Sequence, residues 1–333
     1  MNKNQWLESL RSRRDLPLPI LTFPAAKMLG ITVRELVSDA DRQARLIQAA
    51  AQRWPMAAAL SMMDLSVEAE AFGAPIRYFE DDIPTVAGAI VHDDKDAQNL
   101  SVPAVAGHRT ATYVEGVRKA KALVAGRPLI AGVIGPFSLS GRLMDMTEIM
   151  VDCYMEPDRV RLVLEKATRF LTDYVLAFKA AGADGVLMAE PAAGLLSPAL
   201  CAEFSSFYVK QIADSVKDEH FAFLYHNCGN TLPLIDSLLP IGADAYHFGN
   251  AVDMGEMLKR FPKGTVVMGN LSPSDVFRKG TPETVRQAAL ALIGTCRKYP
   301  DWVVSSGCDI PPKTPLENID AFFAAVRESF SRS

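Results

Sequence analysis

A histidine and two cysteines are the residues of this chain best suited to chemistry. His226 and Cys228 lie at the end of one apolar run, and Cys308 follows another apolar run nearer the C-terminus. If residues 221–227 form a strand, alternation sends side chains 226 and 228 to the same side. Cys308 would then complete a set of three ligands with one open position. This arrangement is typical of catalytic zinc, whereas structural zinc usually has four protein ligands. We therefore predict a Zn²⁺ site at His226, Cys228 and Cys308.

The composition is that of an ordinary globular chain and excludes several functional classes. The chain has 333 residues, of which 49% are hydrophobic and 22% charged, with a net charge of −4. This balance, without any Lys/Arg cluster, argues against a nucleic-acid partner. No apolar run reaches the roughly 20 residues that cross a bilayer, so we expect no membrane association. The five scattered cysteines and the charged N-terminal stretch predict a cytoplasmic protein with reduced thiols.

Apolar runs alternate with amphipathic segments along most of the chain. In 180–191 and again in 240–248, a helix is expected to end at a glycine that leads into a buried strand. Such alternation predicts a parallel sheet. Further strands are expected at 57–64, 128–134, 265–269 and 302–306, and helices at about 111–125, 156–181, 197–217, 281–298 and 315–331.

A closed barrel is favoured over an open sheet. No Gly-x-Gly-x-x-Gly follows the first strand and no Walker-type phosphate loop is present. Polar residues instead gather at the expected strand ends, where a (β/α)₈ barrel places its active site. We predict an α/β fold, a (β/α)₈ TIM-type barrel in one domain, 1–333, with a helical N-terminal cap over 1–55 and the barrel over 56–333. The polar strand-end residues are Asp64, Glu190, His226, Cys228, His247, Asn270 and Cys308.

Further residues are expected near the metal. Glu190 is the predicted catalytic carboxylate, either as a fourth zinc ligand or beside the ligands, although it could instead pair with a neighbouring Arg or Lys. Arg142 could hold an anionic substrate tail such as a sulfonate, or could be a solvated helix cation. The predicted substrate-binding residues are Asn230, His247, Asn270, Arg142 and Asp64.

Motifs spread from about residue 60 to the C-terminus resemble a known group of enzymes. The sequence is similar to the uroporphyrinogen decarboxylase superfamily, and within it to the zinc-dependent methylcobamide:coenzyme M methyltransferases. The specific part is the His-x-Cys motif combined with Gly-Cys-x-x-Pro-Pro. The matching stretches are 64–73, 135–142, 226–230, 269–273 and 307–318.

The resemblance implies both a reaction and a cofactor arrangement. In that family the matching His and two Cys bind zinc, which here are His226, Cys228 and Cys308. The implied reaction moves a methyl group from a methylated corrinoid, as co-substrate, to a small thiol such as coenzyme M. The Asp-x-His-x-x-Gly corrinoid attachment motif is absent, and the nearest string, 218–223, ends in Phe. We therefore expect a separate corrinoid carrier protein as partner, and we leave open whether the chain forms a homodimer.

Two other functions are considered. Decarboxylases of the superfamily use an N-terminal Arg-Gln-Ala-Gly-Arg segment to bind substrate carboxylates, but the corresponding stretch 22–30 has no arginine pair. A tetrapyrrole decarboxylase would therefore lack its cationic anchors. A non-catalytic corrinoid- or metal-binding protein is the other alternative. It predicts tight ligand binding without methyl transfer.

Overall fold

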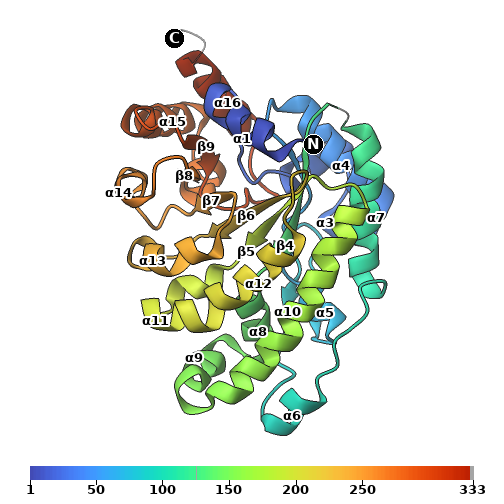
Figure 1. The fold of residues 1–333 in the computed structure, drawn as a ribbon. Helices are drawn as coiled ribbons and strands as arrows, with labels where there is room; N and C mark the ends of the chain where they lie inside the picture. The colour runs from blue at the N-terminus through green and yellow to red at the C-terminus, as the bar shows by residue number, and fades with distance from the viewer. Residues whose placement is uncertain (125, 331–333) are drawn as a thin grey trace.

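The centre of the molecule is a curled parallel sheet of seven strands with helices packed around it (Figure 1). The computed structural model describes residues 1–124 and 126–330. Every neighbouring pair in the sheet is parallel, which confirms the predicted α/β class and TIM-type barrel. In spatial order the strands are β1 (Ala59–Leu60), β4 (Leu129–Ile134), β5 (Gly185–Ala189), β6 (Ala222–Asn227), β7 (Ala245–Phe248), β8 (Val266–Leu271) and β9 (Trp302–Ser306).

An extended segment, residues 17–22, connects the two outer strands of the curled sheet. Leu18 N donates to Val304 O of β9 at 3.0 Å, and Ala57 N, just before β1, donates to Pro17 O at 3.1 Å. Pro17 and Pro19 have no N–H group, so this segment cannot form a continuous ladder. Residues 17–22 therefore occupy the eighth position of the wall and are joined to β9 and β1 by isolated hydrogen bonds, not by a regular ladder.

The helices cover the outside of the sheet, as Figure 1 shows. The longest is α10, and β2 (Ile76–Arg77) and β3 (Thr85–Val86) form a separate hairpin. The helices are α1 (Lys3–Ser12), α2 (Ala26–Leu29), α3 (Val33–Leu36), α4 (Ala40–Arg53), α5 (Val67–Ala71), α6 (Asp94–Asn99), α7 (His108–Leu123), α8 (Pro136–Met144), α9 (Met146–Met155), α10 (Pro157–Ala180), α11 (Pro198–Cys201), α12 (Phe207–Val216), α13 (Ile235–Leu238), α14 (Met254–Arg260), α15 (Pro282–Cys296) and α16 (Leu316–Phe330).

The expected elements are present with small differences. The strand expected at 57–64 forms ladder bonds only over Ala59–Leu60, because its other neighbour is the proline-containing segment. The helix expected at 197–217 is divided by a π-helical stretch, Ala202–Ser206, between α11 and α12. A second π-helical stretch, Pro273–Arg278, follows β8. Such stretches occur often beside functional sites.

Two hydrophobic cores follow from the alternation of side chains along the strands. The inner core fills the barrel and includes Leu187, Leu224 and Met268. The outer core lies between strands and helices and includes Tyr225 and Phe248. Because Leu224 faces inward and Tyr225 outward, His226 also faces the barrel interior.

Helix α1 covers the end of the barrel where the strands begin. Its Trp6 and Leu10 belong to the inner core. Its polar contacts fall on residues just before strands: Lys3 pairs with Asp244 at 3.0 Å, and Arg11 pairs with Asp301 at 2.7 Å. The opposite end, where the strands finish, is left for a site. The boundary predicted between the cap and the barrel at residue 55 stays a prediction.

We predict that Leu18 is a main stabilising contact of the segment that closes the barrel. Its side chain is 3% exposed and belongs to the inner core. Leu18→Ala should therefore lower the free energy of unfolding by about 2–5 kcal/mol, measured by guanidinium denaturation. Leu195→Ala is the matched control, since Leu195 is 71% exposed and its truncation should change stability by no more than about 0.5 kcal/mol. Equal effects of the two changes would contradict this account of barrel closure.

Candidate metal centre

His226, Cys228 and Cys308 lie together at the end of the barrel where the strands finish. One ligand atom from each lies within 4.8 Å of the other two. Among the described residues, 1–124 and 126–330, this is the only group of three or more His, Cys, Asp or Glu side chains arranged in this way. Ligands of a tetrahedral zinc stand roughly 3.5–3.8 Å apart, so small rotations of the thiols would complete the geometry. The predicted convergence is therefore present in the fold.

The three side chains come from two strands on different parts of the sheet. His226 is in β6, Cys228 follows the end of that strand, and Cys308 lies two residues beyond the end of β9. His226 is 1% exposed, whereas both cysteines are partly exposed. The site thus combines a buried imidazole with two half-buried cysteines.

Glycines make room for the loops that carry the two cysteines. A Cβ atom on Gly249 would lie 2.5 Å from Cys228 Cα, and one on Gly307 would lie 2.7 Å from Asn250 N. Real Cβ atoms do not approach other atoms so closely, so any side chain at either position would displace the neighbouring loop. The positions of both thiols therefore depend on the absence of a side chain at Gly249 and Gly307.

Two asparagines fix the same loops through backbone groups. Asn227 Oδ1 accepts from Gly229 N at 2.8 Å, and Asn227 Nδ2 donates to Glu190 O at 2.9 Å. Asn270 Nδ2 donates to Gly249 O at 2.8 Å and to Val252 O at 2.9 Å. The amide of Asn270, predicted to bind substrate, is thus used to hold the loop beside Cys228. Asn227 has no predicted role, although it stands between the two residues of the His-x-Cys motif.

The environment of His226 fits a metal ligand. Its Nε2 atom is buried and has no hydrogen-bond partner. Its Nδ1 atom lies 2.8 Å from His247 Nδ1 and 3.3 Å from His247 O. Metal-binding histidines commonly bind the metal through one nitrogen and hydrogen-bond through the other. A buried nitrogen without a partner is otherwise costly, and a metal ion would remove that cost.

The two thiols interact strongly with each other. A hydrogen bond from Cys308, followed by the influence of His226, lowers the pKa of the Cys228 thiol against the opposing effect of burial. The hydrogen bond to Cys228 and burial raise the pKa of the Cys308 thiol well above its ordinary value. The shared hydrogen bond therefore makes Cys228 the thiol that loses its proton more readily. A divalent cation would favour the deprotonated form of both, because metal ligands of this type are thiolates.

Glu190 lies outside the group of three and already has hydrogen-bond partners. Its carboxylate accepts from Phe137 N at 3.0 Å and from Ser138 N at 2.6 Å, at the first turn of α8. Gly135 allows this approach, since a Cβ there would lie 2.4 Å from a carboxylate oxygen. Burial raises the pKa of Glu190 to about 7. In this conformation the carboxylate caps a helix, and its catalytic role stays a prediction.

The predicted residues Asp64 and Arg142 belong to a second group of charged side chains. Asp64 is buried and accepts from Arg109 Nη1 at 2.5 Å and from the Tyr113 hydroxyl at 2.7 Å. Arg109 also pairs with Glu70 at 2.5 Å. Asp64 is therefore already neutralised. Neither arginine nor tyrosine can be inferred from the sequence near Asp64, because both come from α7, more than 40 residues away along the chain.

Arg142 faces the same group. Burial lowers its pKa, and the negative charges of Glu68 and Asp64 oppose that change. Burial raises the pKa of Glu68 to about 7, and its Oε2 atom has no hydrogen-bond partner. The carboxylate of Asp309, next to Cys308, also lacks partners, and burial raises its pKa well above its usual value. Glu68, expected beside Asp64 near the mouth of the barrel, and Asp309, which the sequence did not single out, thus both have carboxylate oxygens without partners at this end of the barrel.

The remaining predicted residues differ in their surroundings. Asn230 is exposed. His247 is 1% exposed, and its two ring nitrogens contact His226 Nδ1 and Ser305 Oγ, the latter at 2.7 Å. Burial, followed by the neighbouring His226, lowers the pKa of His247 well below its ordinary value. Both nitrogens of His247 are thus occupied within the protein, while its predicted contact with substrate remains untested.

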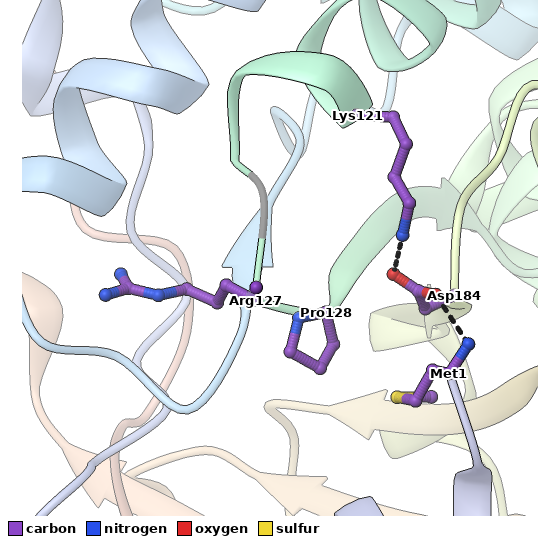
Figure 2. A pocket seen from close by; sticks show the side chains of 6 residues that line it. Met1, Lys121, Arg127, Pro128 and Asp184 are labelled. Atoms are coloured by element: carbon purple, nitrogen blue, oxygen red, sulfur yellow. Dashed lines mark hydrogen bonds and ion pairs between the residues drawn. The ribbon is translucent and has the colours of Figure 1, made fainter.

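A separate hollow lies at the other end of the barrel. Figure 2 shows Lys121 and Met1 approaching the carboxylate of Asp184 from two sides, beside Arg127 and Pro128. Asp184 also accepts from Leu129 N at 2.8 Å, and it directly precedes β5. These contacts tie together the starts of strands, so they stabilise the barrel at the end away from the three ligands.

No described helix combines the length and the apolar content needed to cross a membrane.

Comparison with known proteins places this arrangement among related barrels. The profile of the family described as uroporphyrinogen decarboxylase (URO-D) matches residues 20–329. A uroporphyrinogen decarboxylase of Coxiella burnetii (strain Dugway 5J108-111) is 28% identical over 293 residues, which cover 83% of this chain and 78% of the relative. A solved methyltransferase from Methanosarcina mazei superposes with a TM-score of 0.87 at 22% identity, covering 98% of each chain. A B12-independent methionine synthase from Shewanella sp. W3-18-1 has a TM-score of 0.53 at 17% identity, covering 86% of this chain and 83% of the other.

We predict that Gly249→Ala will reduce metal binding. The added methyl group would meet Cys228 Cα at 2.5 Å and displace one ligand. Zinc affinity, measured by chelator competition, should fall by about 10-fold or more, as for other disturbed metal ligands. Gly294→Ala in α15 is the matched control, because nothing lies within 4 Å of its added atom. Unchanged zinc affinity in Gly249→Ala would show that Gly249 does not determine the position of Cys228.

We also predict that the ion pair of Arg109 with Asp64 has a large effect on stability. Arg109→Met would leave a buried carboxylate without its counter-ion, which should cost about 3–5 kcal/mol of unfolding free energy. Arg118→Met, on the same helix, removes an exposed pair with Glu115 and should cost about 0–1 kcal/mol. Denaturant unfolding of both variants measures the difference. A loss for Arg109→Met no larger than for Arg118→Met would contradict the assigned role of Asp64 as its buried partner.

Proposed function

Because this chain belongs to the uroporphyrinogen decarboxylase family, and because its barrel gathers a His/Cys/Cys set, we propose that it is a zinc-dependent methyltransferase. The methyl donor would be a methylated corrinoid, and the acceptor a small thiol such as coenzyme M. One observation carries the proposal: the buried Nε2 atom of His226 has no partner in the protein and lies with the sulfurs of Cys228 and Cys308.

The donor set suits zinc and leaves room for a substrate. Zinc together with two thiolates and one neutral imidazole has a total formal charge of zero. A thiol bound at the open position would be kept deprotonated. Among the described residues Glu190, the carboxylate predicted as a fourth ligand, is occupied by the amides of α8. The protein's own side chains therefore supply three ligands, and a substrate sulfur can supply the fourth.

The surrounding residues would orient the reactants. His226 is held by contacts on its Nδ1 side. The loop of Cys228 is fixed by the packing of Gly249 and by asparagine hydrogen bonds, and the loop of Cys308 by the packing of Gly307 against Asn250. Arg142, partly balanced by Glu68 and Asp64, could contact an anionic tail of the acceptor. The unpartnered oxygens of Glu68 and Asp309 could accept hydrogen bonds from a bound molecule.

The corrinoid would be presented by another protein. The chain has no Asp-x-His-x-x-Gly attachment motif. A carrier protein would therefore dock at the end of the barrel where the strands finish, with its methyl group directed at the thiol. The structural neighbour from Methanosarcina mazei is named a methyltransferase, which supports transfer of a methyl group as the reaction class.

A second candidate is decarboxylation of a tetrapyrrole, favoured by the name of the curated relatives at 28% identity. Against it, a porphyrinogen requires free cations for its carboxylates. The stretch 22–30 has one cation, Lys27, whose Nζ atom donates to Thr314 O at 3.0 Å. Arg109 is paired with Asp64 and Glu70, and Arg142 faces two carboxylates. These pairings weaken the case for a polyanionic substrate.

The first test is metal content. Purified protein should contain about one zinc per chain, and Cys308→Ser should contain little, because loss of one of three ligands lowers affinity strongly. Cys296→Ser is the matched control, since Cys296 is buried in α15 and lies outside the ligand group. It should retain zinc. Zinc retained equally by both variants would refute the proposed site.

The second part of the test is turnover. Methylcobalamin and then a methylated corrinoid carrier are offered with a panel of small thiols, and demethylation is followed by the corrinoid absorbance. The proposal expects thiol-dependent demethylation that Cys308→Ser lowers by at least about 100-fold. Zinc binding without transfer to any thiol would support the non-catalytic alternative. Metal-independent decarboxylation of a porphyrinogen would support the decarboxylase.

A further inference from the structure

We propose that His247 and Ser305 are positioning residues that fix the tautomer of His226 and so aim its free nitrogen at the metal. The inference rests on the zinc site of the proposed function. It concerns a hydrogen-bonded chain inside the barrel that runs from Leu18 through Ser305 and His247 to His226. Each link joins a different part of the wall: the closing segment, β9, β7 and β6.

The donor-to-acceptor direction of these hydrogen bonds follows from the end at the Leu18 carbonyl. The Ser305 hydroxyl donates to Leu18 O at 2.7 Å, and a carbonyl oxygen can only accept. A hydroxyl has one proton, so Ser305 Oγ must accept from His247 Nε2, 2.7 Å away. His247 therefore carries its proton on Nε2, and the Nδ1 atom of the neutral ring is an acceptor.

The other end gives the same answer independently. His226 Nδ1 lies 3.3 Å from the carbonyl oxygen of His247 and 2.8 Å from His247 Nδ1. The carbonyl can only accept, so His226 Nδ1 must carry a proton, which it shares between two acceptors. In the neutral ring, the form that binds a metal, the Nε2 atom of His226 is then a bare lone pair, and it is the atom without a partner in the protein. Both ends therefore require the same tautomer.

The hydrogen-bonded residues are buried, and their end at Leu18 is conformationally restricted. His226, His247 and Ser305 are each 1% exposed or less. Leu18 lies between Pro17 and Pro19, whose fixed φ angles restrict the segment that supplies the terminal carbonyl. Leu18, at the other end, is 3% exposed, so all four residues are largely shielded from solvent that could exchange their protons. The lone pair of His226 is thus set before any metal arrives.

This assigns a function to the wall segment that replaces an eighth strand. Partners of metal-bound histidines commonly change metal affinity by 10–100-fold when removed. Loss of the Ser305 hydroxyl should remove the acceptor 2.7 Å from His247 Nε2, so that the ring moves its proton to Nδ1 more readily. That form competes with His226 as donor and weakens the metal-binding tautomer. His247 would therefore act through His226 and need not touch substrate.

Nuclear magnetic resonance of the unmodified protein gives a direct test. The chain has five histidines, so imidazole ¹⁵N signals can be assigned with few variants. In the zinc-stripped full chain we expect His226 protonated on Nδ1 and His247 protonated on Nε2. Addition of zinc should shift His226 Nε2 without moving either proton. A metal-free His226 protonated on Nε2 would overturn the proposal.

A matched pair of serines separates positioning from folding. Ser305 and Ser306 both bond the closing segment, since Ser306 Oγ accepts from Ile20 N at 3.0 Å, but of the two hydroxyls only that of Ser305 contacts His247, while Ser306 interacts with His247 through its backbone, which Ser306→Ala keeps. Ser305→Ala should weaken zinc binding about 10-fold in chelator competition, while Ser306→Ala should leave it within about 2-fold. Equal losses of zinc affinity in the two variants would refute the positioning role of Ser305. An unchanged His247 tautomer in Ser305→Ala would refute it as well.

Two substitutions of His247 extend the test. His247→Asn keeps an acceptor near the Nδ1 position and should retain most zinc affinity, whereas His247→Leu removes it and should lose about 10-fold or more. Equal losses in both would indicate a packing role only and would overturn the proposal. If zinc binding and the tautomers are as expected but no methyl transfer is seen, the proposed reaction is rejected. The positioning role of His247 and Ser305 is then still supported.

Discussion

The interior of the barrel tolerates a polar side chain only where its polar atoms have partners, and this constraint organises the metal centre. An unpaired polar group in an apolar interior costs on the order of 1–3 kcal/mol. The chain meets the constraint with bonds between nearby parts of the barrel wall, such as those from Ser305 to Leu18 and from His247 to Ser305. His226 Nε2 is one of a small number of buried polar atoms among the described residues that have no such partner. An atom of that kind beside two thiols is best explained by a ligand that the protein alone does not supply.

The need to pair buried charges also occupies the two arginines near the site, so they are not free to bind the carboxylates of a decarboxylase substrate. Arg109 is paired with Asp64 and Glu70, and Arg142 faces Glu68 and Asp64. Where family resemblance points to both decarboxylase and methyltransferase, the charge pairing within the barrel favours a substrate with few negative charges. In the proposed function, zinc held by two thiolates would suit a thiol acceptor, because soft sulfur ligands match that metal. The fold is common to both functions, so the choice depends on these side chains.

The N-terminal segment connects stability with the site. It closes the barrel wall, contributes Leu18 to the inner core and supplies the carbonyl at the end of the hydrogen-bonded chain. Pro17 and Pro19 prevent it from pairing as a regular strand, but they also restrict its backbone. A segment that is irregular by strand criteria is thereby suited to hold a fixed acceptor.

The sequence by itself predicted the fold class, most strands and helices, and the three candidate ligands, since periodicity, glycine-terminated helices and the short His-x-Cys and Gly-Cys-x-x-Pro-Pro motifs are each local signals. It also indicated that His226 and Cys228 point to the same side and Tyr225 away from them, because alternation fixes the two faces of a strand; which face is the barrel interior came from the structure. Only the tertiary structure decided that Glu190 caps α8, that Asp64 pairs with Arg109, and that His247 contacts His226 and Ser305. These contacts join residues 21 to 58 positions apart, and their partners are set by strand register and side-chain packing. No local pattern specifies such partners, which is why the ligands could be predicted and their supporting residues could not.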